Sequence, residues 1–213
     1  MNRTRVKICG LTREQDVQVA VEAGVDAIGF ILHADSPRKI DINQAARLRR
    51  NVPAFVNVVG VFVDAEVEFI QKAANEIGLD TIQLHGQESP DYVKSLNLNY
   101  IKALRTKSSE QVMQACKSYS DATALLLDPY VKGRHGGTGQ LLDHTKWPSE
   151  QTDVRLILAG GLSPTNISER LSLLSPYGVD INSGIESSPG IKNAEALLEC
   201  VDKVRLFDAE RLA

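Results

Sequence analysis

Two side chains that can transfer protons each follow a short apolar run in this chain of 213 residues. Cys9 ends a run that begins at Arg5, and Asp128 ends a run over residues 124–127. A thiolate accepts protons, and a carboxyl group is a general acid or base. Each residue also has a structural reading, because a free cysteine is often an inert buried hydrophobe and aspartate before proline often starts a turn. The elements that position the two residues decide between these readings.

Residues two positions apart share one face of a regular strand. Lys7 therefore lies on the face of Cys9, and a nearby ammonium group lowers the pKa of a thiol. We expect Cys9 to be a proton acceptor near neutral pH for this reason. Asp180 and Asn182 share a face in the same way, and we expect that face to line a cavity.

Short β-branched runs alternate with amphipathic stretches along the whole chain, which is typical of a parallel sheet with crossover helices. We predict a single (β/α)8 barrel domain over residues 1–213, because eight strand and helix units leave about 27 residues for each. An open doubly wound sheet is less consistent with the sequence, since no GxGxxG turn follows the first strand. The predicted strands are 5–9, 27–32, 55–63, 81–84, 100–104, 124–128, 155–158 and 179–182.

The predicted helices are marked by capping residues. Thr12 is positioned to cap the first helix, and Gly24, Gly78 and Gly178 each stand just before a strand, as helix C-terminal caps do. The predicted helices cover residues 13–23, 42–50, 67–77, 90–96, 109–119, 164–174 and 194–206, with only a weak helix before Trp147.

Glycine-rich loops follow the last three predicted strands and suggest a phosphate site. Backbone N–H groups approach an anion closely where glycine is present, and barrels of this type bind phosphate after strands seven and eight. Glycine is also ordinary turn punctuation, so one pair alone would be weak evidence. The predicted phosphate-binding residues are Gly137, Gly160, Gly161, Ser183 and Gly184.

Two further polar residues follow the second and fourth predicted strands. Arg38 has no apolar face to cover and could hold a second anion, since its fork suits a planar carboxylate, although a solvated arginine is the common alternative. His85 shares a strand face with Gln83, and a structural hydrogen bond fits it as well as a catalytic role does.

Charge and cysteine usage exclude several classes of function. The net charge of −3 argues against a nucleic-acid partner, and no run of about 18 apolar residues predicts a membrane span. The three cysteines form no CxxC pair, and no two histidines have metal-ligand spacing, so we expect reduced thiols and no metal. The N-terminal residues lead into a strand without a long apolar secretory core, so we expect a cytoplasmic location.

A set of short motifs occurs in one order along the chain and closely resembles the phosphoribosylanthranilate isomerase family. The resemblance runs from about residue 5 to Ala194. The motifs are Lys7-Ile8-Cys9-Gly10-Leu11-Thr12, Ser36-Pro37-Arg38, Val59-Gly60-Val61-Phe62, Gln83-Leu84-His85-Gly86, Gly136-Gly137-Thr138-Gly139, Leu158-Ala159-Gly160-Gly161-Leu162 and Ser183-Gly184-Ile185-Glu186.

The resemblance implies an Amadori rearrangement of phosphoribosylanthranilate in tryptophan biosynthesis, without a cofactor. It makes Asp128 the general acid at the ribose ring oxygen and Cys9 the general base at C2. Arg38 would pair with the anthranilate carboxylate, and Asp180 would stabilise the developing iminium. The sequence leaves open a monomer or a homodimer. The sequence departs from the family pattern at Asn182, where serine is common, and at a few other positions. None of these positions is the acid or the base.

Two other functions fit the sequence less well. A metal-dependent pentose-phosphate epimerase would need inward histidines and carboxylates as metal ligands, which the sequence does not supply. An inert phosphate-binding module on the same barrel would not need both Cys9 and Asp128.

Overall fold

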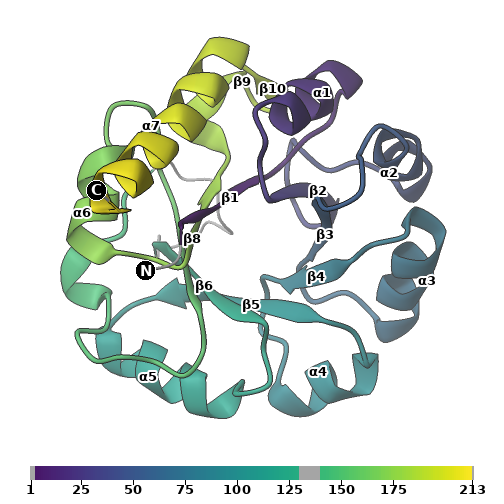
Figure 1. Ribbon diagram of the computed structural model, residues 1–213. Helices are drawn as coiled ribbons and strands as arrows, with labels where there is room; N and C mark the ends of the chain where they lie inside the picture. The colour runs from purple at the N-terminus through teal and green to yellow at the C-terminus, as the bar shows by residue number, and fades with distance from the viewer. Residues whose placement is uncertain (1–2, 130–139, 213) are drawn as a thin grey trace.

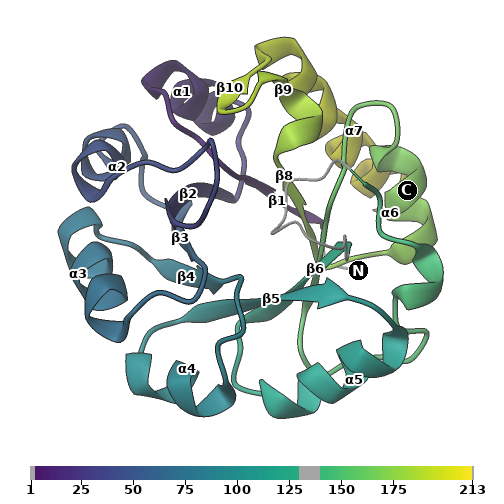
Figure 2. The same ribbon diagram turned by 180° about the vertical axis from the view of Figure 1, so that it is seen from behind.

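Eight parallel strands close into a barrel in the computed structural model, which describes residues 3–129 and 140–212 (Figure 1). Each strand pairs with the next, and β1 also pairs with β8, so the predicted barrel is confirmed. The view from behind shows the same ring with its helices on the outside (Figure 2). The barrel strands are β1 (Arg5–Ile8), β2 (Ala27–His33), β3 (Asn57–Phe62), β4 (Thr81–Leu84), β5 (Tyr100–Thr106), β6 (Ala124–Pro129), β7 (Leu156–Ala159) and β8 (Gly178–Ile181).

The helices follow the strands in the expected order. They are α1 (Glu14–Glu22), α2 (Ile42–Arg49), α3 (Val67–Ile77), α4 (Pro90–Leu96), α5 (Ser109–Ser118), α6 (Ile167–Leu174) and α7 (Ala194–Leu212), with a 3-10 turn η1 (His144–Lys146) between β6 and β7. Helix α6 begins three residues later than predicted, because the Asn166 side chain accepts from Ser163 N–H and donates to the Gly161 carbonyl, which holds a turn before the helix. Among the described residues no helix is long and apolar enough to cross a membrane.

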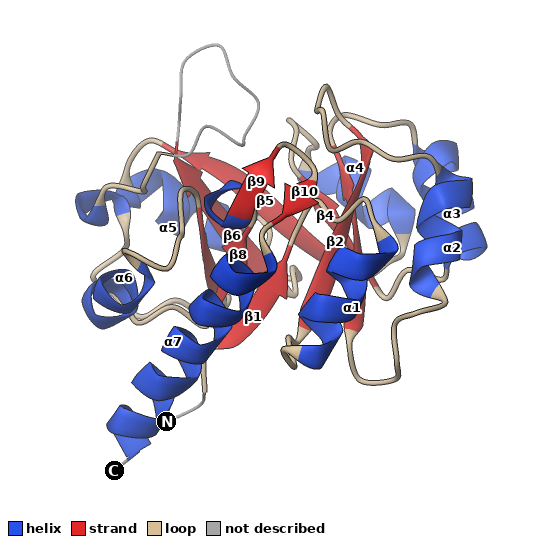
Figure 3. Cartoon of the chain, turned by 90° about the horizontal axis from the view of Figure 1, so that it is seen from above, coloured by secondary structure: helices blue, strands red, loops and turns tan. Residues whose placement is uncertain are grey.

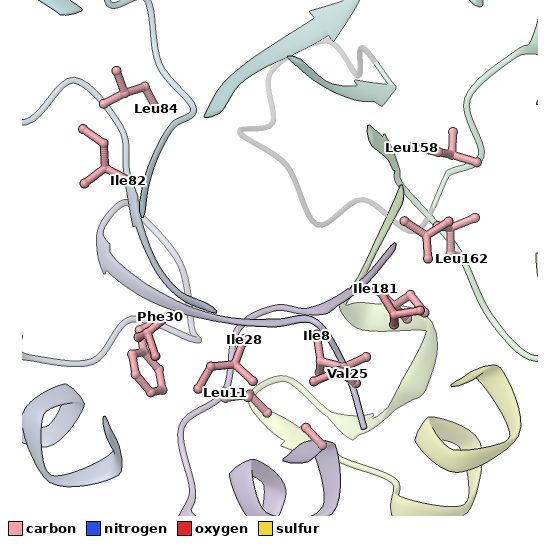
Figure 4. Close-up of a cluster of buried hydrophobic side chains, with 14 of the residues drawn as sticks. Ile8, Leu11, Val25, Ile28, Phe30, Ile82, Leu84, Leu158, Leu162 and Ile181 are labelled. Carbon is pink, nitrogen blue, oxygen red and sulfur yellow. The ribbon is translucent and has the colours of Figure 1, made fainter. Parts of the chain in front are cut away.

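Successive side chains along each strand point alternately to the outer and the inner side of the barrel wall. Ile8, Ile28 and Phe30 are fully buried on the side that faces the helices (Figure 4). The barrel interior is filled instead by a smaller apolar cluster near β5–β7 and by Cys9, Ile31 and Val61. Because the strand period is two, this packing places Lys7 and Cys9 on the inner face together.

Two of the predicted caps are wrong. Helix α1 has Arg13 at its N-cap without a side-chain bond, because the Thr12 hydroxyl donates to the Gly190 carbonyl instead, 2.6 Å away. Helix α6 ends at a left-handed Ser175, and Gly178 lies in β8, where a β-carbon would come within 3.0 Å of the Arg5 carbonyl oxygen. Gly178 therefore serves strand packing and not helix termination.

An additional hairpin follows β8 and was not predicted. After the 3-10 turn η2 (Ser183–Ile185), strands β9 (Glu186–Ser188) and β10 (Ile191–Lys192) pair antiparallel. The hairpin lies beside α1 (Figures 1 and 3), and its Lys192 N–H donates to Asp16 of that helix. This position brings Glu186 and Lys192 close to the loops after β1 and β2.

Candidate active site

A cavity of about 310 Å³ opens at the carboxyl ends of the barrel strands. Most of the residues predicted from the sequence line it: Cys9, Arg38, His85, Asp128, Gly160, Gly161, Asp180 and Ser183. Gly184 is not among the lining residues, and Gly137 lies outside the described residues. The fold therefore brings the candidate acid, the candidate base and both candidate anion sites to one place.

Cys9 is held at the barrel mouth by its own backbone and by a small neighbour. Its N–H donates to the Ile181 carbonyl at 2.9 Å, and its side chain is buried. Gly10 then turns the chain with φ +70°. Gly29 on β2 leaves the space for the thiol, since a β-carbon there would lie 2.8 Å from Cys9 Sγ. A larger residue at Gly29 would force the sulfur out of this position.

Lys7 shares the inner face with Cys9, as predicted, but its ammonium group is already paired. Lys7 Nζ donates to Asp180 Oδ1 at 2.8 Å, and both side chains are buried. Burial acts to lower the pKa of Lys7, but the charges of Asp180 and Cys9 raise it above its ordinary value. Lys7 is therefore a fixed buried cation.

The expected low thiol pKa is wrong for the protein without its substrate. Burial, followed by the negative charge of Asp180, raises the pKa of the Cys9 thiol above its ordinary value, and Lys7 offsets only part of this. Lys7 and Cys9 are close in sequence, whereas the carboxylate that neutralises Lys7 comes from a distant strand. Asp180 lies beside Lys7 because β1 and β8 pair with those two residues in register.

A Lys7→Met variant should have a still higher pKa at Cys9, because Asp180 would then act on the thiol without a compensating cation. The thiolate absorbance of Cys9 measured against pH, in a background with Cys116→Ser and Cys200→Ser, reports this shift. Lys203→Met, which removes a half-exposed lysine from α7, is the control. An unchanged pKa of Cys9 in Lys7→Met would show that Lys7 does not influence ionisation of the thiol.

Asp128 is the last residue but one of β6 and is buried at the cavity wall. Its Oδ2 lies 3.5 Å from His85 Nε2, and that nitrogen has no hydrogen-bond partner among the described residues. On the other side of the ring, Gln83 Nε2 lies 3.3 Å from His85 Nδ1, so the predicted shared face of these two residues is confirmed. His85 is thus oriented by Gln83 and directed toward Asp128.

The loop that carries His85 is fixed by a buried ion pair that sequence reasoning missed. Lys102 Nζ donates to Glu88 Oε2 at 3.0 Å and to the carbonyls of Leu84 and Gly86, on either side of His85. Burial lowers the pKa of Lys102 although Glu88 opposes this. The only sequence signal was a lysine inside an apolar strand.

The loops after β7 and β8 place backbone groups at the cavity. Gly160 and Gly161 both have positive φ, at 90° and 60°, which glycine adopts without strain. A β-carbon at Gly160 would meet Pro129 and the Gln140 carbonyl, so a side chain would not fit there. Gly184 is also tightly packed, since a β-carbon would lie 2.0 Å from the Leu162 carbonyl oxygen.

Arg38 is buried and forms a side-on ion pair with Glu186, which sequence reasoning did not assign. Arg38 Nη2 donates to Oε2 at 2.7 Å, and Nε donates to Oε1 at 2.9 Å. Lys192 Nζ donates to the same Oε1 at 2.9 Å. Burial acts to raise the pKa of Glu186, but Arg38 and Lys192 hold it below its ordinary value.

Three other polar residues at strand ends, His33, Asp64 and Arg105, do not line the cavity, whereas Asn182 lines it beside Asp180 as predicted. His33 Nδ1 lies 2.9 Å from the Val63 carbonyl, and Asp64 accepts from the Gln87 N–H. Arg105 is paired in register with Asp128 but is not a lining residue. Within residues 3–129 and 140–212, no three histidine, cysteine or acidic side chains are grouped as a metal site.

A family model described as N-(5'phosphoribosyl)anthranilate (PRA) isomerase matches residues 6–203. The chain belongs to the PRA isomerase family. The same family was expected from the ordered motifs, and that expectation is confirmed.

Individual members of the PRA isomerase family are similar to this chain over nearly their full length. The N-(5'-phosphoribosyl)anthranilate isomerase of Bordetella avium (strain 197N) is 43% identical over 214 residues, with 97% of each chain covered. The crystal structure of the Thermus thermophilus enzyme is 35% identical with a TM-score of 0.86, covering 95% of this chain and 99% of that one. A second solved member, 31% identical with a TM-score of 0.84 and covering 95% and 98%, is in complex with reduced 1-(o-carboxyphenylamino)-1-deoxyribulose 5-phosphate.

Proposed function

We propose that Cys9 and Asp128 are the general base and general acid with which this PRA isomerase converts its aminoaldose substrate into the aminoketose in tryptophan biosynthesis. The observation that carries the proposal is their placement. Both side chains line one cavity: Cys9 directly follows β1 and Asp128 lies in β6, and these two strands are not neighbours in the barrel. A small sugar between them can therefore meet a proton donor and a proton acceptor on different sides.

The acid opens the ribose ring in this proposal. Asp128 protonates the ring oxygen while the C1–O bond breaks, and the lone pair of the anthranilate nitrogen forms a C1=N double bond. The product of this step is a cationic iminium with a free hydroxyl at C4. A carboxyl group at the cavity wall supplies the proton without any other reagent.

The base acts in the second step, in which the iminium nitrogen regains its electron pair. The Cys9 thiolate removes the proton at C2, the C2–H electrons form C1=C2, and the C1=N electrons return to nitrogen. The enol formed at C2 becomes a ketone when C1 gains a proton and the C2 hydroxyl group loses one. Asp180 lies beside Cys9 and Lys7, and we assign its negative charge to stabilisation of the iminium cation.

The two ends of the substrate are anions, and the cavity offers a separate place for each. We assign the phosphate to the loops at Gly160, Gly161, Ser183 and Gly184, where backbone N–H groups are available. Gly137 stays a prediction for the same group and lies outside the described residues. We assign the carboxylate of the aromatic ring to Arg38, because Arg38 lines the cavity and Glu186 binds only its Nε and Nη2 edge.

One assay tests the function directly. Purified protein is given freshly generated phosphoribosylanthranilate, and the loss of substrate fluorescence is followed with and without a chelator. We expect turnover in both samples, because the proposed acid and base are side chains of the chain itself. Absence of turnover would reject the isomerase activity, and turnover abolished by the chelator would reject a reaction without metal.

Two further expectations belong to this proposal. We expect one cytoplasmic barrel domain that acts either as a monomer or as a homodimer. Sedimentation velocity at several protein concentrations distinguishes these two states.

A further inference from the structure

Three buried charged side chains form a cluster beside the cavity that the acid-base chemistry does not use. They are Arg38, Glu186 and Lys192, whose side chains are 10%, 4% and 1% exposed. Ion pairs buried to this degree are costly to desolvate and are weak evidence for added stability. A role in the site is therefore a better account of the cluster than a role in folding.

The contacts of Arg38 fix the direction of its guanidinium group. Glu186 binds the Nε and Nη2 edge, with distances of 2.7 to 3.1 Å. The arginine stem passes over Gly10, where a β-carbon would lie 2.9 Å from Arg38 Cδ. Nη1 has no hydrogen-bond partner among the described residues, and Arg38 lines the cavity. Glu186 therefore binds one edge of the guanidinium group, and the other edge is available for a ligand.

Lys192 in turn fixes Glu186. Its Nζ donates to Glu186 Oε1 at 2.9 Å and to Asn182 Oδ1 at 2.7 Å, and its backbone N–H donates to Asp16 on α1. Glu186 also accepts from the Gly190 N–H at 3.3 Å. The carboxylate is therefore held by the β9–β10 hairpin and has little freedom to follow Arg38.

The charges of the cluster add to +1, from two cations and one carboxylate. A second carboxylate, supplied by a ligand at the outer edge of Arg38, would make it neutral. A ligand without that carboxylate would leave the buried excess charge uncompensated. The cluster thus favours one kind of ligand by its charge as well as by its direction.

We propose that Glu186, held by Lys192, is a positioning residue that directs Arg38 at a carboxylate of the substrate and so makes the cavity select aminoaldose phosphates with an acidic aryl group. The inference rests on the proposed function, in which Arg38 binds that carboxylate. It gives the last residue of the Ser183-Gly184-Ile185-Glu186 motif a role.

Ligand binding measured by calorimetry tests the proposal without relying on turnover. The first probe is reduced 1-(o-carboxyphenylamino)-1-deoxyribulose 5-phosphate, and the second is the same compound without its carboxyl group. In Glu186→Gln we expect about a tenfold weaker Kd for the first probe and less than about a twofold change for the second, as for loss of one charge-assisted hydrogen bond. Lys192→Met should have the same pattern as Glu186→Gln, with a larger loss of affinity for the first probe than for the second.

The controls separate positioning from general damage. Glu199→Gln removes a carboxylate from the exposed face of α7 and should leave both Kd values unchanged. Equal losses for both probes in Glu186→Gln and Lys192→Met would overturn the proposal, because they would show a structural role only. Tighter binding of the first probe would overturn it too, because Glu186 would then be a competitor for Arg38.

The same experiment distinguishes failure of this inference from failure of the proposed function. Arg38→Met should remove the preference of the protein for the first probe. If it does so while Glu186→Gln keeps the preference, the positioning role is rejected and the carboxylate site stands. If the unaltered protein binds both probes equally, the carboxylate site itself is rejected.

Discussion

Replacing Cys9 with serine should lower kcat by at least about 10²-fold, the low end for a general acid-base group and about 2.7 kcal/mol in barrier. A serine hydroxyl fits the space that Gly29 leaves for the thiol, so the cavity should be preserved. It is a far weaker acid than a thiol and is not ionised at neutral pH. The initial rate of substrate fluorescence loss gives kcat and KM for the variant.

The other two cysteines provide matched controls for this substitution. Cys116 and Cys200 are also buried thiols, but they lie on α5 and α7 and do not line the cavity. Cys116→Ser and Cys200→Ser should keep kcat near that of the unaltered protein. A Cys9→Ser variant with near-normal kcat would reject Cys9 as the base.

The raised pKa of Cys9 sets the sign of the pH dependence. Burial and the charge of Asp180 disfavour the thiolate, so only a minor fraction of the free protein carries the active base at neutral pH. Since kcat/KM reports the free enzyme, it should rise with pH on the acid side of the profile. Once the iminium has formed, its positive charge stabilises the Cys9 thiolate. The substrate therefore helps to activate Cys9.

The sequence predicts the barrel well because its signals are local. Eight strand runs and their intervening helices can be recognised from periodicity, and parity alone places Lys7 with Cys9 and Gln83 with His85. Residues at strand ends must then converge at one mouth. Cys9, Asp128 and Asp180 line the cavity for this reason.

What the sequence does not predict depends on contacts between distant segments. Glu186 reaches Arg38 across 148 positions, and Lys7 reaches Asp180 across 173 positions. The raised pKa of Cys9 follows from the second pair, and the direction of Arg38 follows from the first. Neither ion pair can be predicted from the sequence of a single strand, because its two residues belong to different elements.

Replacing Asp128 with asparagine should also lower kcat by at least about 10²-fold, because an amide of the same shape cannot protonate the ring oxygen. His85 lies 3.5 Å away and should remain in place, since Gln83 contacts its other nitrogen and Lys102 holds its loop. Asp202→Asn, on the exposed face of α7, is the control and should have normal kcat. Near-normal kcat in Asp128→Asn would reject the acid role.

A substrate deuterated at C2 tells the acid from the base. In Asp128→Asn ring opening becomes the slow step, and the C2–H bond is intact when it occurs, so the isotope effect on kcat should shrink toward one. In Cys9→Ser removal of the C2 proton becomes slow, and the isotope effect should be fully expressed. The opposite pattern would exchange the two roles, while equal isotope effects in both variants would show that Cys9 and Asp128 act on the same step.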